Sequence, residues 1–167
     1  KEKSYLHIDV GGGSTELTSI VNGQTKNSKS FSIGSVRLLE GKVSKKSWND
    51  MKEWIKSNTN SVTGIKAIGS GGNINKIASM LGKKKGEYVP YNGIKILLKK
   101  IEAKDFHQRI TTFGLRPDRA DVIIPASKIY LNCMKWSKSQ KILVPQSGLA
   151  DGIIEQLYDT YKSVSKS

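Results

Sequence analysis

Two carboxylates flank three consecutive glycines near the start of the chain, in the segment YLHIDVGGGSTEL. Asp9 ends an apolar, β-rich run, and Glu16 follows the glycines, seven residues after Asp9. Glycine packs no side chain and is conformationally free, so a strand that leads into three of them turns very tightly or receives a group close to its backbone. We expect Asp9 and Glu16 to lie on two strands joined by this turn and to face one pocket.

A second glycine-rich turn, GSGG, follows a short β-type run and leads directly into a helix. Successive backbone N–H groups in such turns converge on one spot and bind phosphate oxygens. The helix that follows adds spare donors and the positive end of its dipole. Neither turn matches the dinucleotide fingerprint or the Walker motif. The residues predicted to bind phosphate in the two turns are Gly11, Gly12, Gly13, Ser14, Gly69, Ser70, Gly71 and Gly72.

Carboxylates beside a phosphate site repel the substrate unless a cation lies between them. Asp9 and Glu16 therefore imply Mg²⁺, which binds one or two carboxylates together with substrate phosphates and waters. In the alternative interpretation, Asp9 caps the turn and Glu16 pairs with a surface lysine. His7 precedes Asp9 by two positions and His107 lies on a distant helix. We expect structural roles for both histidines.

The chain of 167 residues is strongly basic, with 28 Lys and Arg against 14 Asp and Glu and a formal net charge of +14. This charge favours polyanionic partners, which include nucleic acid, phosphate polymers, nucleotides and anionic membranes. A solubilising, lysine-rich surface is the alternative. The few aromatic residues do not interleave with the basic ones as a stacking platform would, which disfavours nucleic acid.

The single cysteine, Cys133, excludes an internal disulfide and disfavours a cysteine-based zinc site. We expect it to be buried and inert. No apolar run approaches the roughly 18 residues of a membrane span, and no signal peptide is visible. We therefore expect no membrane partner. Because the chain starts with Lys1 and not with Met, we expect it to be a piece of a longer protein.

The pattern of elements predicts one α/β domain. Residues 4–34 form a three-stranded antiparallel meander, with the three glycines in its first turn and Asn22-Gly23 in its second. After the meander come a short helix at 35–41, a helix at 44–62 capped by Ser44 or Ser47, a strand at 65–68 and a helix that Gly82 ends. A loop at 83–93 then leads into a long helical stretch at 93–114. The chain continues with a loop that contains Pro117, an apolar helix, a short strand that begins at Lys141 and a final amphipathic helix.

The segment HIDVGGGSTEL resembles the signature of the exopolyphosphatase and guanosine pentaphosphate phosphohydrolase (Ppx/GppA) family, which belongs to the actin, sugar kinase and heat-shock chaperone superfamily. The resemblance runs in the family's order from about Tyr5 to Tyr158. It continues through SFSIGSVRLLE, AIGSGGNINKIA, GLRPDRADVIIPASKIY and SGLADGIIEQL. In the last of these segments Ala150 stands where the family usually has arginine.

The resemblance implies an actin-like (ribonuclease H-like) α/β fold, with helices flanking a mixed sheet that begins with the meander. Residues 1–167 correspond to the second of the family's two domains, and the first would precede Lys1 and carry the family's proposed glutamate base. By the same resemblance, Asp9 and Glu16 are the catalytic and metal-binding carboxylates, and the two glycine turns are the phosphate loops.

The implied reaction is the Mg²⁺-dependent release of terminal phosphate from a phosphoanhydride chain, either inorganic polyphosphate or guanosine pentaphosphate. The resemblance implies a cytoplasmic enzyme, leaves a homodimer open, and predicts that this domain alone is weakly active or inactive. Two alternatives are a catalytically inactive nucleotide- or alarmone-binding regulator and a kinase of the same superfamily. The presence of Asp9 and Glu16 argues against the first, and the continuation through STEL favours the phosphatases over the second.

Overall fold

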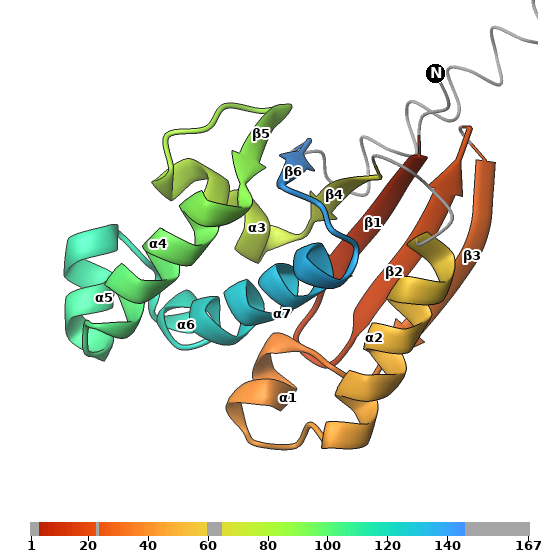
Figure 1. Cartoon of the computed structure of the whole chain (residues 1–167). Coiled ribbons are helices and arrows are strands. Elements are labelled where there is room, and N and C mark those ends of the chain that lie inside the picture. Colours follow the sequence, from red (N-terminus) through yellow and green to blue (C-terminus); the bar gives the residue numbers. More distant parts are fainter. Residues whose placement is uncertain (1–3, 23, 60–64, 146–167) are drawn as a thin grey trace, which may run out of the picture.

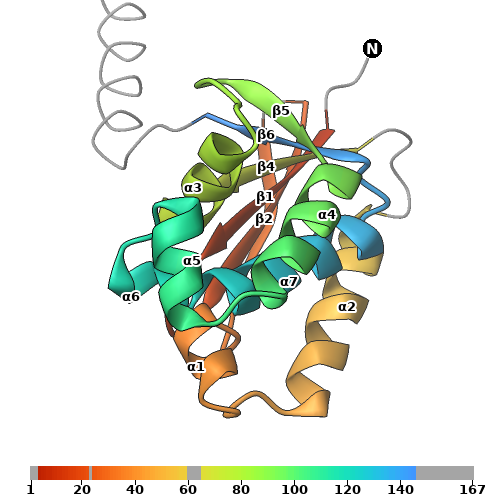
Figure 2. The same ribbon diagram turned by 90° about the vertical axis from the view of Figure 1, so that its left-hand side faces the viewer.

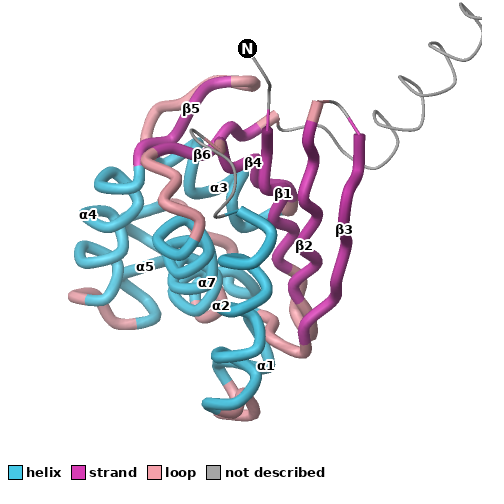
Figure 3. The backbone as a smooth tube through the Cα atoms, turned by 45° about the vertical axis from the view of Figure 1, so that its right-hand side comes forward, coloured by secondary structure: helices cyan, strands magenta, loops and turns pink. Residues whose placement is uncertain are grey.

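The structure, a computed structural model, describes residues 4–22, 24–59 and 65–145. Its centre is a six-stranded mixed sheet in the order β3-β2-β1-β4-β6-β5 (Figure 1, Figure 3). The strands are β1 Ser4–Val10, β2 Thr15–Val21, β3 Gln24–Phe31, β4 Lys66–Ser70, β5 Glu87–Pro90 and β6 Lys141–Val144. The predicted antiparallel meander is confirmed as β1, β2 and β3.

The three central strands β1, β4 and β6 run parallel to one another, and β5 pairs antiparallel with β6. Parallel strands end at the same edge of a sheet, which is the edge where open α/β sheets bind ligands. The turn at residues 11–14 follows β1, and the turn that begins at Gly71 follows β4. The topology therefore places the two glycine turns side by side.

Strand β1 has two chemically different faces, because successive side chains of a strand point to opposite sides. Leu6, Ile8 and Val10 are buried in the core, whereas His7 and Asp9 lie on the other face and are only half-buried. This alternation keeps the helix-covered face apolar and leaves the ionisable residues of the strand on the opposite face.

Seven helices are described. They are α1 Ser35–Leu39, α2 Lys45–Thr59, α3 Gly72–Met80, α4 Tyr91–Glu102, α5 Phe106–Phe113, α6 Pro117–Ala120 and α7 Ile123–Trp136. Helix α7 is central, because it packs on β1 and contacts α1, α2, α3 and α4 (Figure 2). Its inner face carries Tyr130, Cys133 and Met134, all fully buried, and burial raises the pKa of the Cys133 thiol to about 12. None of the described helices has the length and apolar character needed to cross a membrane.

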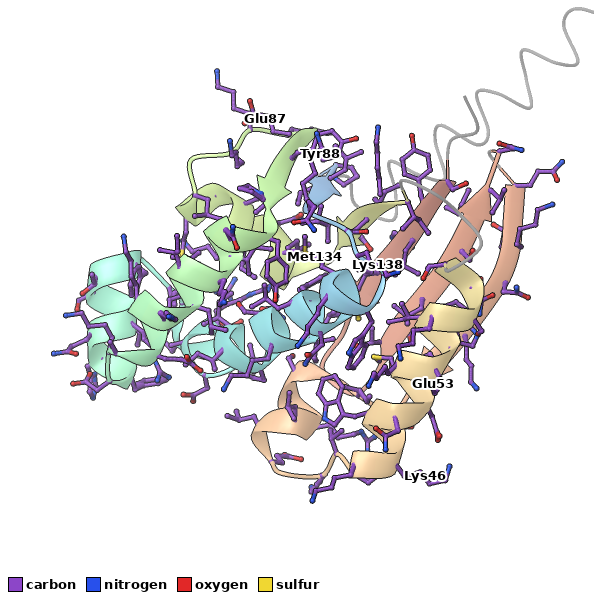
Figure 4. The ribbon with its side chains drawn as sticks, viewed as in Figure 1. Lys46, Glu53, Glu87, Tyr88, Met134 and Lys138 are labelled. Carbon is purple, nitrogen blue, oxygen red and sulfur yellow. The ribbon has the colours of Figure 1, made fainter. Side chains whose placement is uncertain are left out.

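Helix α2 begins as predicted, because the hydroxyl of Ser44 accepts a hydrogen bond from the backbone N–H of Ser47 at 3.0 Å. Its inner stripe holds Met51 and Ile55, both fully buried. Lys46 and Glu53 project from its outer side (Figure 4). The helix is described as far as Thr59, so the end of the predicted helix at 60–62 lies outside the described residues.

Three predicted elements were wrong. The stretch 93–114 is not one helix, because a new helix starts at Phe106, where Asp105 and Gln108 form a reciprocal capping box. The predicted loop at 83–93 contains β5, which is held by its pairing with β6. The loop around Pro117 contains the short helix α6, with proline in its first turn. The predicted final helix lies outside the described residues.

Candidate functional site

The first glycine turn is held by helix α1, which binds its carbonyl groups. The N–H of Ser35 donates to the oxygen of Gly11 at 2.9 Å, and those of Val36 and Arg37 donate to the oxygen of Gly12 at 2.9 and 3.1 Å. These are first-turn donors of α1, which have no partner within the helix itself. The turn is therefore fixed by backbone contacts on its carbonyl side.

Only one amide on the other side of the same turn has an acceptor among the described residues. Gly11 donates to the oxygen of Ser14 at 2.9 Å, which closes the turn, and Arg37 Nε donates to the oxygen of Gly13 at 3.0 Å. The N–H groups of Gly12, Gly13 and Ser14 donate to no acceptor within the described part of the chain. Such a row of free amides in a glycine turn suits an anion.

Close packing between α1 and the turn makes Gly34 necessary, a residue that the sequence did not mark as functional. A Cβ at position 34 would overlap the backbone of Gly12 and Gly13. Only glycine lets α1 approach the turn this closely. A glycine immediately before a predicted helix was the available signal, but it is equally typical of an ordinary loop.

A shallow cavity of about 390 Å³ opens beside the first turn. Two glycines of the turn form one wall, and charged residues of α1 and the following loop form the other. Its lining is Gly12, Gly13, Val36, Arg37, Glu40 and Lys42. Lys42 and Glu40 form an ion pair at 2.9 Å, so the guanidinium of Arg37 is the remaining cation of this lining.

The second glycine turn leads into α3 with its first amides unpaired. Gly71 has φ of +105°, a conformation that glycine adopts readily, and it is the N-cap of the helix. The N–H groups of Gly71, Gly72 and Asn73 donate to no acceptor among the described residues. The guanidinium of Arg119 lies against Gly72, where a Cβ would displace it, and donates to Asn73 Oδ1 at 3.1 Å.

Gly69 differs from the other predicted phosphate-binding residues, because it lies within β4 and faces the core. A Cβ at this position would lie 2.7 Å from Ile142 Cδ1 and 3.0 Å from Ile74 Cγ1. The packing of α3 and β6 against β4 is therefore a sufficient reason for glycine here. Ser70 is the last residue of β4 and lies opposite Asp9 in the parallel ladder.

Asp9 and Glu16 lie directly opposite each other in the antiparallel ladder of β1 and β2. Directly paired residues point to the same face of a sheet, so the two carboxylates share the face that the core does not use. Glu16 Oε1 accepts hydrogen bonds from the hydroxyls of Ser14 at 2.7 Å and Ser30 at 3.0 Å. Neither lysine pairing by Glu16 nor turn capping by Asp9 occurs among the described residues.

The carboxylate of Asp9 is half-buried yet has no hydrogen bond or ion pair within the described part of the chain. It lies between the two turns, with Oδ1 3.2 Å from the position that a Cβ on Gly71 would take. A half-buried carboxylate without a partner is unfavourable unless a cation or water binds it. Its surroundings therefore suit a metal ion bound at this edge.

The donor set fits Mg²⁺ rather than a metal held entirely by protein. No group of three or more His, Cys, Asp and Glu side chains that could hold an ion occurs among the described residues. Mg²⁺ is usually bound by one or two carboxylates and completes its six ligands with waters and phosphate oxygens. Asp9 and Glu16 can supply the carboxylates, and the free amides nearby can hold the phosphates.

His7 binds Ser70 across β1 and β4, with Nε2 2.9 Å from the serine Oγ. Burial lowers the pKa of His7 below its ordinary value of 6.5, and the negative charge of Asp9 opposes this shift. The contact ties the two strands together just before their glycine turns. His107 lies exposed on α5, with its ring against Phe106.

Tyr130 joins α7 to the second turn, a contact that sequence reasoning missed. Its hydroxyl donates to the backbone oxygen of Ser70 at 2.6 Å, and its side chain is fully buried. Burial raises the pKa of Tyr130, an effect that the backbone of Val10 opposes and the charge of Asp9 reinforces. The hydroxyl therefore stays protonated and remains a donor. In the sequence, a tyrosine in an apolar helix indicates only core packing.

The family model of the Ppx/GppA phosphatase family matches residues 1–161. A bifunctional 3-dehydroquinate synthase/phosphatase of Fusobacterium nucleatum is 28% identical over 175 residues, which cover 90% of this chain and 26% of that protein. The chain thus spans about a quarter of this curated relative.

Solved structures show the same fold. An exopolyphosphatase from Cytophaga hutchinsonii superposes with a TM-score of 0.75 at 20% identity, over 96% of this chain and 58% of that one. The Ppx/GppA family member of Aquifex aeolicus gives a TM-score of 0.73 at 23% identity, over 95% and 58%. The predicted actin-like α/β fold is confirmed by these matches. With the family model matching nearly its whole length, this chain belongs to the Ppx/GppA phosphatase family.

Proposed function

We propose that this chain supplies the phosphate-binding and metal-carboxylate half of an active site that releases terminal phosphate from a phosphoanhydride chain. The substrates that fit this chemistry are inorganic polyphosphate and guanosine pentaphosphate. One observation carries the proposal: two turns lie at one sheet edge with Asp9 between them, and neither their outer amides nor the Asp9 carboxylate has a partner among the described residues. Membership of the Ppx/GppA phosphatase family supports it.

The amides of the two turns bind and orient the phosphate oxygens. In the first turn the donors are the amides of residues 12–14. At the N-terminus of α3 they are the amides of residues 71–73. Fixed donors of this kind stabilise charge that builds up on the transferred phosphoryl group, and they need no reorganisation during the reaction.

Asp9 and Glu16 would hold Mg²⁺, which neutralises phosphate charge when it is bound. Glu16 is kept in place by the hydroxyls of Ser14 and Ser30, so its carboxylate is oriented before substrate arrives. Through Asp9 and Glu16, the protein positions the phosphoanhydride chain of the substrate and an attacking water. Catalysis here is chiefly positioning and electrostatic stabilisation.

The second half of the site would come from another domain of the same protein. The chain covers 58% of the length of the Cytophaga hutchinsonii exopolyphosphatase and of the Aquifex aeolicus family member. A preceding domain would supply the general base and close the cleft over the substrate, excluding bulk water. A homodimer and a cytoplasmic location are compatible with this arrangement.

Orthophosphate release by the full-length protein tests the proposal, with polyphosphate and guanosine pentaphosphate as substrates and Mg²⁺ present. Asp9→Asn should lower the rate by about two orders of magnitude or more, the scale expected for a charged group at the reacting centre. Asp50→Asn is the matched control, because Asp50 lies exposed on α2, where it pairs with Lys46. A wild type that releases phosphate from neither substrate would refute the proposal.

A further inference from the structure

Tyr130 makes a buried contact that the chemistry described above does not use. Its hydroxyl reaches the backbone oxygen of Ser70 at 2.6 Å from the core side of the sheet. Ser70 ends β4, and the next residue, Gly71, begins the second glycine turn. The contact therefore acts on the peptide group that joins the strand to the turn.

The orientation of this peptide decides where the Gly71 amide points. In a trans peptide the C=O of one residue and the N–H of the next lie in one plane and point in opposite directions. Because Tyr130 holds the Ser70 oxygen on the core side, the Gly71 N–H points away from the core. That amide has no acceptor among the described residues.

Nothing in the glycine itself prevents the opposite orientation. Turning the peptide by half a turn would change φ of Gly71 from +105° to about −75°, which is a common backbone conformation. Glycine adopts both conformations readily. After such a turn the amide would point into the core and be lost as a phosphate donor, so the Tyr130 hydroxyl selects between two accessible states.

The neighbourhood makes this amide important. The Cβ position of Gly71 lies 3.6 Å from the Tyr130 hydroxyl and 3.2 Å from Asp9 Oδ1. On the other face of the sheet His7 Nε2 lies 2.9 Å from the hydroxyl of Ser70. Ser70 is thus anchored through its carbonyl and its side chain, immediately before the amide that lies beside Asp9.

We propose that Tyr130 is a positioning residue for phosphate binding, whose hydroxyl holds the Ser70–Gly71 peptide so that the Gly71 amide faces the substrate. The inference rests on the proposed function, because it assigns Tyr130 to the same phosphate site. It concerns binding rather than the chemical step, since the hydroxyl donates to the backbone oxygen of Ser70.

Tyr130→Phe in the full-length protein tests the role, because it removes only the hydroxyl and keeps the ring in the core. KM for polyphosphate should rise by about tenfold, the scale of one lost hydrogen bond to a charged group, with kcat within about twofold. Binding of tripolyphosphate, measured by calorimetry with Mg²⁺, should weaken by the same factor.

Two controls separate positioning from general destabilisation. Tyr88→Phe removes the hydroxyl of a half-buried tyrosine on β5, whose ring lies under the ammonium group of Lys141. Ile101→Val weakens the core at a fully buried position of α4. Both variants should keep the wild-type KM. A similar KM increase in Ile101→Val would show that the Tyr130 effect is only a loss of stability, and would overturn the proposal.

The outcomes distinguish this inference from the proposed function. A wild type that neither binds tripolyphosphate nor releases phosphate refutes both. If the wild type binds tripolyphosphate and releases phosphate but Tyr130→Phe has an unchanged KM, only the role of Tyr130 is overturned.

Amide hydrogen exchange of the wild type covers the case in which Tyr130→Phe does not fold. The Gly71 amide should exchange rapidly in the free protein and become protected by tripolyphosphate. Strong protection of that amide without ligand would mean that it already faces the core, which would overturn the proposal.

Discussion

Glu16 and Asp9 lie opposite each other, yet their carboxylates have different surroundings. Glu16 accepts two serine hydroxyls and is exposed, whereas Asp9 is half-buried and has no partner among the described residues. A carboxylate fixed by neighbours is suited to orienting water or metal. One left without partners is suited to direct binding of a cation. We therefore expect the two residues to have separable roles in one site.

Replacing Glu16 by glutamine tests its role at the scale of a single charge. Glutamine keeps an oxygen that Ser14 and Ser30 can bind, so the local geometry should survive while the negative charge is lost. We expect Glu16→Gln to reduce turnover by the full-length protein by about two orders of magnitude or more. Glu53→Gln, on the outer side of α2, should leave turnover unchanged. A near-normal rate for Glu16→Gln would remove Glu16 from the mechanism.

His7 predicts a pH dependence of stability. Its folded-state pKa lies below the ordinary 6.5 because of burial, so the unfolded chain takes up a proton first as the pH falls. The free energy of unfolding should therefore decrease as the pH falls below about 6.5, and His7 should have no effect on its slope well above that pH. Chemical denaturation between about pH 5 and pH 8 measures this. His7→Gln should flatten the slope, and an unchanged slope in this variant would contradict the prediction.

The short helix α1 covers the carbonyl side of the first glycine turn and in this sense caps it. Its amides bind the carbonyls of Gly11 and Gly12, and Arg37 binds that of Gly13. The turn can thus expose its own amides while its carbonyls are paired. The approach of α1 depends on Gly34.

Gly34→Ala should separate α1 from the turn, because the added Cβ overlaps backbone atoms that cannot rotate away. Overpacking of this kind typically costs about 1–3 kcal/mol of stability, so thermal unfolding should shift clearly downward. Gly13→Ala is the steric control, since a Cβ there meets nothing within 4 Å. Equal melting temperatures for Gly34→Ala and the wild type would contradict the capping role of α1.

The two turns should be the places where anions bind. In crystals soaked with phosphate or sulfate, we expect the anion against the amides of residues 12–14 or 71–73, which have no acceptor in the part of the chain that the structure describes. Difference density gives a direct answer. An anion found only beside surface lysines, with both turns empty, would count against the site.

Local patterns predicted much of this architecture. The meander followed from alternation, the three glycines and Asn22-Gly23, all of which act within a few residues. The shared face of the two carboxylates followed from the turn between their strands. The break before Phe106 was missed because a capping box inside a continuous helical pattern outweighed the periodicity. Strand β5 was missed because β6, far along the chain, holds it.

Long-range contacts explain what the sequence could not reveal about the site. The hydroxyl of Tyr130 reaches Ser70 across 60 positions of sequence, and no local pattern encodes that meeting. Gly34 likewise acquires its role only when α1 folds back on the first turn. Phosphate binding by Gly69 stays a prediction, and packing is a second reason for this glycine, because a Cβ there would crowd Ile142 and Ile74.

Over the whole molecule, the net charge of +14 would complement the polyanionic substrates proposed above. Attraction between exposed charges is screened by salt over about 10 Å at 0.1 M. Binding of long-chain polyphosphate should therefore weaken steeply with salt. Tripolyphosphate bound by the turns should be less sensitive. Titrations at several ionic strengths measure both, and equal salt dependence would mean that surface lysines, not the turns, dominate the binding.

The most direct test compares phosphate release from polyphosphate, with Mg²⁺, by the 167-residue chain alone and by the full-length protein. We expect the chain to fold and to bind tripolyphosphate, because its sheet, helices and both turns form one continuous structure. We also expect a rate far below that of the full-length protein, because the groups that position water and close the cleft would lie in the other domain. Equal rates would contradict this division of the active site, since they would place the catalytic base within these residues.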